Sequence, residues 1–91
     1  MYKNLDPLLY GPFRLAIVSY LISHSKASFK ELKGETAATS GNISVQLKKL
    51  EEAGYLRIEK SFLDNYPLTQ VRLTKKGIKA FEEYVKALKK Y

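Results

Sequence analysis

Asn42, Gln46 and Lys49 recur at steps of four and three residues, which places them along one line of a helix. An amide side chain carries a donor and an acceptor side by side, so Asn and Gln can each form two hydrogen bonds with the edge of an adenine. A lysine can reach a guanine or a phosphate. This line could therefore read the edges of base pairs, provided that a helix holds it clear of the core.

The helix that carries this line is predicted over about residues 40 to 53. Thr39 is its best N-cap, because an apolar series with helical spacing begins four residues later, and Gly54 ends it. The series consists of Ile43, Leu47 and Leu50. On a wheel of about 100° per residue these three side chains share one side, and the opposite side carries Asn42, Val45, Gln46 and Lys49. The outward face is therefore polar and slightly basic.

Similar signals define the other elements. Pro12 suits the first turn of a helix, Ser28 and Glu31 have the spacing of a capping box, and Gly34 is a plausible stop for the helix they open. The segment LDNYPL has turn chemistry between two runs with strand character. The predicted elements are, in order, helices over about residues 12 to 24, 28 to 34 and 40 to 53, strands over 55 to 62 and 69 to 73, and a last helix over 75 to 90.

This order predicts an α+β fold that is mainly α: three helices, a two-stranded hairpin and a C-terminal helix. Ninety-one residues suffice for one small core and are too few for two, so residues 1–91 are expected to form a single domain. Within it, residues 1–11 are a lead-in and residues 75–91 are the last helix.

Composition restricts the function. The chain has no cysteine and one histidine, which leaves little material for metal binding or for nucleophilic catalysis. No paired carboxylates or phosphate-binding glycine loop can be assembled, so we expect no enzyme activity, no cofactor and no metal. No segment has the length and apolar character of a membrane span or a signal peptide, so a cytoplasmic protein without a membrane partner is expected.

The charge points to a polyanionic partner. The formal net charge is +7, and the part of the chain after Val45 holds 11 of the 16 basic residues and 6 of the 9 acidic ones. Two short helices followed by a capped helix with a polar face match a helix-turn-helix, and a hairpin directly after them makes it the winged variety. The predicted partner is double-stranded DNA, with the third helix in the major groove and the hairpin as a second contact.

The sequence also resembles the small winged-helix transcriptional regulators related to the MarR and ArsR groups. The resemblance rests on RLAIVSYL, ASFKEL, GNISVQLKKLEEAGYLRIEKSF and YPLTQVRLTKKGIKAFEEYV, which cover about residues 7 to 90. It implies sequence-specific DNA binding by a homodimer, with Pro67 in the wing and Leu73, Thr74 and Gly77 at the junction of strand and helix. The chain has Gln46 where the family often has His, and no basic residue before Pro67 in the wing.

The candidate DNA-binding residues form two groups. On the recognition helix and its cap they are Thr39, Ser40, Gly41, Asn42, Ser44, Val45, Gln46 and Lys49. The candidates for wing and phosphate contacts are Lys48, Lys60, Asn65, Tyr66, Thr69, Arg72, Lys75 and Lys76. Two alternatives stay open at this point: Val45 either contacts a thymine methyl or is simply exposed, and Lys48 either contacts a phosphate or pairs with Glu52.

An apolar stripe on the last helix predicts a homodimer formed through the first and last helices. The stripe would otherwise only complete the chain's own core. The candidate interface residues are Leu8, Leu9, Phe13, Ile17, Ile78, Phe81, Tyr84, Val85, Leu88 and Tyr91. No separate ligand domain is expected, so a small-molecule effector, if the protein has one, would bind in a cleft between the subunits.

Two other functions fit the same fold. A winged helix can serve as a protein-interaction module, which does not require a basic recognition face. It can also bind all DNA sequences alike through phosphates, as a chromatin-like protein does. Asn42 and Gln46 argue against this last function, since base-reading side chains contribute little to it.

Overall fold

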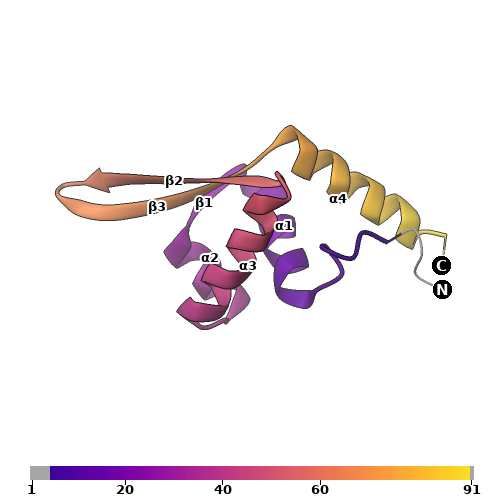
Figure 1. Cartoon of the computed structure of the whole chain (residues 1–91), viewed down its shortest axis with the longest axis horizontal. Coiled ribbons are helices and arrows are strands. Elements are labelled where there is room, and N and C mark those ends of the chain that lie inside the picture. The colour runs from indigo at the N-terminus through magenta and orange to yellow at the C-terminus, as the bar shows by residue number, and fades with distance from the viewer. Residues whose placement is uncertain (1–4, 91) are drawn as a thin grey trace.

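The computed structural model describes residues 5–90, which form four helices and three strands. Helices α1 to α3 lie together on one side of a sheet, a long hairpin extends away from them, and α4 runs toward the opposite end of the molecule (Figure 1). The predicted class, α+β and mainly α with the architecture of a winged helix, is confirmed. The elements are α1 (Pro12–His24), β1 (Lys26–Ser28), α2 (Phe29–Thr36), α3 (Ser40–Glu52), β2 (Leu56–Leu63), β3 (Tyr66–Leu73) and α4 (Lys75–Leu88). The first four residues of the predicted lead-in, and Tyr91, lie outside the described part.

The start of α2 is fixed by the capping box that the sequence predicts. The Ser28 hydroxyl accepts a hydrogen bond from the Glu31 backbone N–H at 3.0 Å, and the Glu31 carboxylate accepts one from the Ser28 N–H at 3.2 Å. The predicted stop at Gly34 is wrong. The helix continues to Thr36 and ends because Ala37 adopts the left-handed conformation, with φ of 57°.

Helix α3 begins and ends close to the predicted positions. The Thr39 hydroxyl accepts from the Asn42 N–H at 3.2 Å, which confirms Thr39 as the N-cap. After the helix, Gly54 takes a φ of 81°, a left-handed conformation that glycine adopts without steric cost. The chain therefore turns sharply from α3 into β2.

The sheet is antiparallel, with β3 between β1 and β2. Strand β1 was not predicted; it pairs only with residues 70–72 of β3. The β2–β3 hairpin closes through Asp64 and Asn65, both with positive φ, as the common two-residue hairpin turns require. Strand β3 starts at Tyr66, three residues earlier than predicted. Pro67 is tolerated there because β1 does not reach that far, so the missing N–H leaves no ladder bond unmade.

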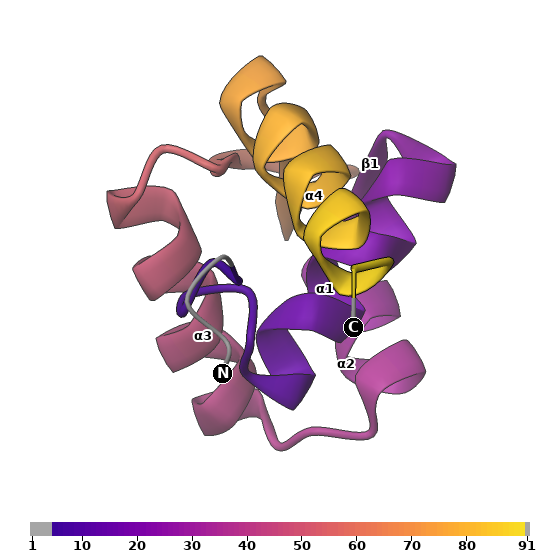
Figure 2. The ribbon, with the colours of Figure 1, turned by 90° about the vertical axis from the view of Figure 1, so that its right-hand side faces the viewer.

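The core lies between the three helices and the inner face of the sheet. Apolar side chains from every element except α4 fill most of it, and they are Leu5, Leu9, Ile17, Val18, Leu21, Ala27, Leu32, Ala38, Ile43, Leu47, Leu50, Leu56, Val71 and Leu73. Helix α4 adds Tyr84 and Ala87. Figure 2 shows α4 nearest the viewer, with α1 to α3 behind it. The helix is thus placed away from the free end of the hairpin.

The junction into α4 depends on a close backbone approach. A Cβ on Gly77 would lie 2.1 Å from the backbone oxygen of Tyr55, so only glycine fits. The Thr74 hydroxyl accepts from the Gly77 N–H at 3.0 Å and donates to the Gly54 carbonyl at 2.6 Å. Thr74 therefore caps α4 and ties its start to the turn that follows α3.

Candidate nucleic-acid interface

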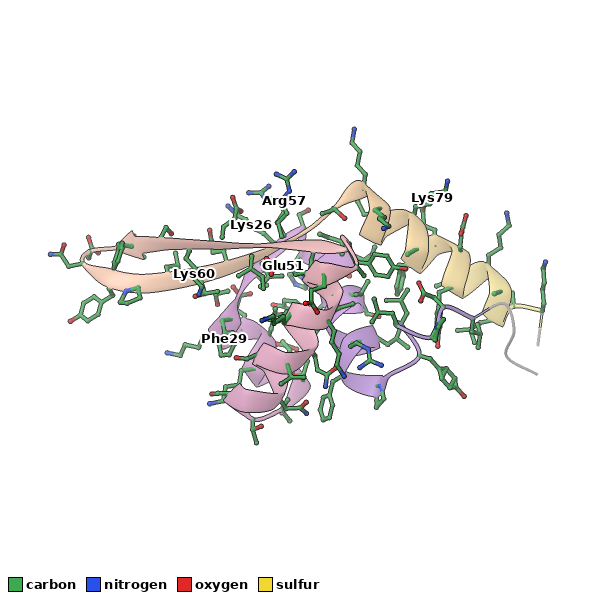
Figure 3. All side chains as sticks on the ribbon, in the orientation of Figure 1. Lys26, Phe29, Glu51, Arg57, Lys60 and Lys79 are labelled. Carbon is green, nitrogen blue, oxygen red and sulfur yellow. The ribbon has the colours of Figure 1, made fainter. Side chains whose placement is uncertain are left out.

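A groove of about 640 Å³ separates α3 from the inner face of the hairpin. Ser44, Lys48 and Glu51 of α3 line one side, and Lys60 and Thr69 of the hairpin line the other. Phe29, at the start of α2, also borders it. Figure 3 shows Phe29, Glu51 and Lys60 on the same side of the hairpin. Polar side chains of α3, β2 and β3 thus line one groove.

The exposed face of α3 adjoins this groove. Ile43, Leu47 and Leu50 hold the helix to the core, as the sequence predicts, and leave Gly41, Ser44, Lys48 and Lys49 exposed. Val45 lies among them with 51% of its surface exposed. A Cβ built on Gly41 meets no atom within 4 Å, so the space beside the helix N-terminus is open. The face can therefore approach another molecule without rearrangement of the chain.

The predicted line of Asn42, Gln46 and Lys49 is divided in the structure. Lys49 is exposed, whereas both amides are half-buried beside Arg14 of α1. Arg14 Nη1 donates to Gln46 Oε1 at 2.7 Å, and Gln46 Nε2 donates to Asn42 Oδ1 at 2.9 Å. Each end of the Gln46 amide therefore has a partner within the chain. The prediction that Gln46 forms two hydrogen bonds with a base stays a prediction, and it requires these contacts to open.

The wing and phosphate candidates do not share one surface. Lys60 and Thr69 face α3 across the groove. Arg72 has the opposite parity on β3: it stands on the outer face of the sheet, where its Nε lies 3.4 Å from Glu59 Oε1. The phosphate contact predicted for Arg72 stays a prediction, and it requires a phosphate on the face opposite to the groove, because strand alternation turns this side chain away from α3.

The remaining cationic candidates lie at the start of α4. Lys75 and Lys76 are exposed, and the Lys76 ammonium sits 5.8 Å from the centroid of the Tyr55 ring. Tyr55 follows the C-terminal end of α3, so these lysines are near the end of α3 opposite its N-terminal cap. Asn65 and Tyr66 are exposed at the hairpin turn.

Three residues of this region escaped the sequence analysis. Phe29 reaches the groove because the capping box at Ser28 places it at the first position of α2. Glu51 follows Ser44 by seven residues, two helical turns, which was a readable signal for the same side of α3. Arg14 had no signal, since its contact with Gln46 joins residues 32 apart in the sequence.

Only some of the residues predicted to form a dimer interface lie on the surface of the chain. Leu9, Ile17 and Tyr84 are buried in the chain's own core, so their assignment to an interface is wrong. Leu8 and Phe13 are half-buried against the same core. Ile78 and Leu88 remain exposed. A groove of about 590 Å³ between α1 and α4 is lined mainly by apolar side chains, with Ser25, Arg72 and Glu82 among them, and the apolar ones are Leu21, Ile22, Leu73, Ile78, Phe81 and Val85.

Tyr55 joins the lead-in to the C-terminal end of α3. Its hydroxyl donates to the Asp6 carboxylate, and the Thr74 N–H donates to its backbone oxygen at 3.1 Å. Burial, followed by the hydrogen bond to Asp6, raises the pKa of Tyr55 to about 12. The phenol is thus held neutral in a contact that connects three segments of the fold. No helix within residues 5–90 has the length and apolar character to cross a membrane.

Comparison with known proteins shows which proteins the chain is similar to. A family model described as a winged helix DNA-binding domain matches residues 13–91. An uncharacterized protein of Methanocaldococcus jannaschii is 35% identical over 72 residues, which cover 79% of this chain and 78% of that protein. The structure of a transcriptional regulator homologue from Pyrococcus horikoshii superposes with a TM-score of 0.86 at 29% identity, over 91% of this chain and 82% of that one.

A more distant structure has the same fold. A MarR family transcriptional regulator from Silicibacter pomeroyi gives a TM-score of 0.74 at 22% identity. The match covers 90% of this chain and 54% of that regulator. The likeness therefore extends over nearly all of the present chain and about half of the larger protein.

Proposed function

We propose that this chain, which belongs to the winged helix DNA-binding domain family, binds specific sequences of double-stranded DNA as a homodimer and thereby regulates transcription. The observation that supports it most is the shared groove: Ser44 and Lys48 of α3 face Lys60 and Thr69 of the hairpin across an open space. A recognition helix in the major groove and a wing on the adjacent backbone require this arrangement. We assign no reaction to the chain, because the family is one of DNA-binding domains.

In this proposal the exposed face of α3 reads the bases. Val45 contacts a thymine methyl group, and Asn42 presents its free NH₂ group to a base edge. Gln46 holds Asn42 in place through the hydrogen bond at 2.9 Å and reads a base only after Arg14 releases it. Ser40 and Gly41 place the helix N-terminus against a phosphate, where backbone N–H groups and the helix dipole favour an anion.

Phosphate contacts flank the reading face. Lys48 and Lys49 project from α3, and Lys60 projects from the hairpin on the far side of the groove. Glu51 shares that groove and repels phosphate, so it restricts the backbone to the outer part of the groove. Lys75 and Lys76 extend the positive surface at the C-terminal end of α3.

We place the dimer contact on α1 and α4. The groove between them carries the exposed side chains Ile22 and Ile78, and Leu88 extends the apolar surface along α4. A twofold axis there presents two α3 helices to one duplex, so the half-sites form an inverted repeat with centres about 34 Å apart. We also propose that the protein acts in the cytoplasm.

Selection of bound duplexes from a random pool tests the function. The wild-type protein is expected to enrich an inverted repeat, and light scattering is expected to give the mass of two chains. Val45→Glu places a carboxylate on the reading face and abolishes enrichment. Ser23→Glu makes the same charge change at an exposed position of α1, and this variant is expected to enrich the same repeat as the wild type. A wild-type protein that enriches no sequence, or equal enrichment by both variants, contradicts the proposal.

A further inference from the structure

The end of the hairpin carries an unusual amount of exposed apolar surface. Phe62 and Tyr66 are each 75% exposed, and Leu63 is 61% exposed. Isolated exposed apolar residues are ordinary, but three large ones within five residues mark a contact surface. The charged residue among them is Asp64, so this tip has no cation with which to attract phosphate. It is chemically distinct from the wing of a regulator that holds DNA through arginine or lysine.

The strand register assigns these side chains to different faces. Phe62 pairs with Pro67, and Lys60 pairs with Thr69, in a ladder without a bulge. Side chains two residues apart share a face, so Phe62 and Pro67 continue the face that borders the groove of α3. Leu63 and Tyr66 form the next pair and stand on the opposite face. The hairpin thus presents an aromatic ring and a proline ring toward the side where α3 is exposed.

We propose that Phe62, supported by Pro67, is an apolar wedge that enters the minor groove beside the major groove occupied by α3, partly unstacks one base step and bends the duplex. The inference rests on the proposed function and adds to it a contact that reads deformability rather than base edges. Apolar side chains that enter a minor groove act in this way, and they kink the duplex toward the major groove.

Two features favour DNA as the occupant of this surface. The first is continuity, because the face that carries Phe62 already carries Lys60 and Thr69 of the groove. The second is spacing. Phe62 follows Lys60 by two residues, about 7 Å along the strand. Lys60 is nearer to the body of the fold than Phe62, so its long, flexible side chain can reach a backbone phosphate while Phe62, closer to the turn, enters the groove.

The wedge has a consequence for sequence preference. Pyrimidine–purine steps unstack more readily than others, so the preferred site contains a TA or CA step where the tip inserts. This step lies outside the bases that α3 contacts, one on each side of the inverted repeat. The bound duplex is bent toward the major groove at those two steps.

The test compares Phe62→Ala with Leu63→Ala on the duplex enriched by the wild-type protein. The two residues are adjacent, both exposed and on opposite faces of the hairpin. Bending is measured by energy transfer between dyes at the duplex ends, and unstacking by the fluorescence of 2-aminopurine at the outer step. Phe62→Ala is expected to lose the bend, the fluorescence increase and the step preference, with affinity about tenfold lower. Leu63→Ala is expected to retain all of them.

The outcomes separate the wedge from the proposed function. Phe62→Ala that bends the duplex as the wild type does, or Leu63→Ala with the same loss as Phe62→Ala, overturns the wedge and leaves the function standing. If Phe62→Ala changes the number of chains in the free protein, as measured by light scattering, the tip is a contact between copies of the chain, and the wedge is overturned. A wild-type protein that enriches no duplex overturns the function itself.

Discussion

Arg14 of α1 donates a hydrogen bond from Nη1 to Oε1 of Gln46 on α3 at 2.7 Å, and from Nε to the Leu8 carbonyl at 2.5 Å. One guanidinium group therefore links the lead-in, the first helix and the recognition helix. The contact orients the amide of Gln46, and through it the amide of Asn42. The edge of the reading face is therefore set by a residue of α1, which lies outside both α2 and α3.

Removal of this guanidinium is expected to weaken the fold and to change base preference. Arg14→Ala leaves the Gln46 oxygen without its partner, and the free energy of unfolding falls by about 1 to 2 kcal/mol in a denaturant titration. Arg72→Ala removes an arginine of an exposed ion pair and costs less than about 1 kcal/mol. If both variants lower the free energy of unfolding equally, the hydrogen bond between Arg14 and Gln46 does not stabilise the fold.

Gly77 is expected to be intolerant of any side chain. The Cβ of alanine would lie 2.1 Å from the Tyr55 oxygen and 2.9 Å from Leu73 Cδ1, so Gly77→Ala destabilises the protein by about 3 kcal/mol or prevents folding. Gly34→Ala is the matched control. Its Cβ meets nothing within 4 Å in α2, and it stabilises the helix by about 0.5 to 1 kcal/mol. Thermal unfolding measures both, and a stable Gly77→Ala protein would refute the close approach.

Tyr55 is expected to make unfolding depend on pH in the alkaline range. Its pKa is raised to about 12, so the unfolded chain loses this proton at lower pH than the folded one. The stabilisation is complete below the ordinary tyrosine pKa of about 10 and is lost as the pH rises toward 12. Denaturant titrations should show a difference between wild type and Tyr55→Phe that shrinks across this range. A constant difference would mean that the phenol titrates normally.

The two faces of the hairpin are expected to differ in their contribution to DNA binding. Lys60→Gln removes one phosphate contact, and the slope of log binding constant against log salt concentration decreases in magnitude by about 0.9. Arg72→Gln removes the same charge from the outer face of the same hairpin and leaves the slope unchanged. Fluorescence anisotropy at several salt concentrations gives both slopes. A larger effect of Arg72→Gln would reverse the assignment of faces.

The elements that the sequence predicts well are those with local signals. Ser28 with Glu31 and Thr39 cap their helices as expected, because a cap needs only side chains within three residues of the helix start. The burial of Leu47 and its neighbours on α3 follows from helical period alone. These patterns place the third helix and its outward face correctly before any tertiary contact is known.

The features that the sequence did not reveal depend on distant partners. Strand β1 is three residues long and exists because it pairs with Arg72 and its neighbours, far along the chain. The amide of Gln46 is engaged by Arg14, and Ile17 is buried because the helices close around it. Helical period could assign Ile17 to an apolar face, but it could not decide whether that face meets the chain's own core or a second copy.

Cross-linking at position 45 tests the central claim most directly. The chain has no cysteine, so Val45→Cys introduces a single thiol on the exposed face of α3. The enriched duplex carries a disulfide-linked thiol on a cytosine N4 in the major groove, at each position of the half-site in turn. We predict a protein–DNA cross-link at one or two adjacent positions for Val45→Cys and none for Ser23→Cys. No cross-link at any position, or equal cross-linking by both variants, would contradict a recognition helix in the major groove.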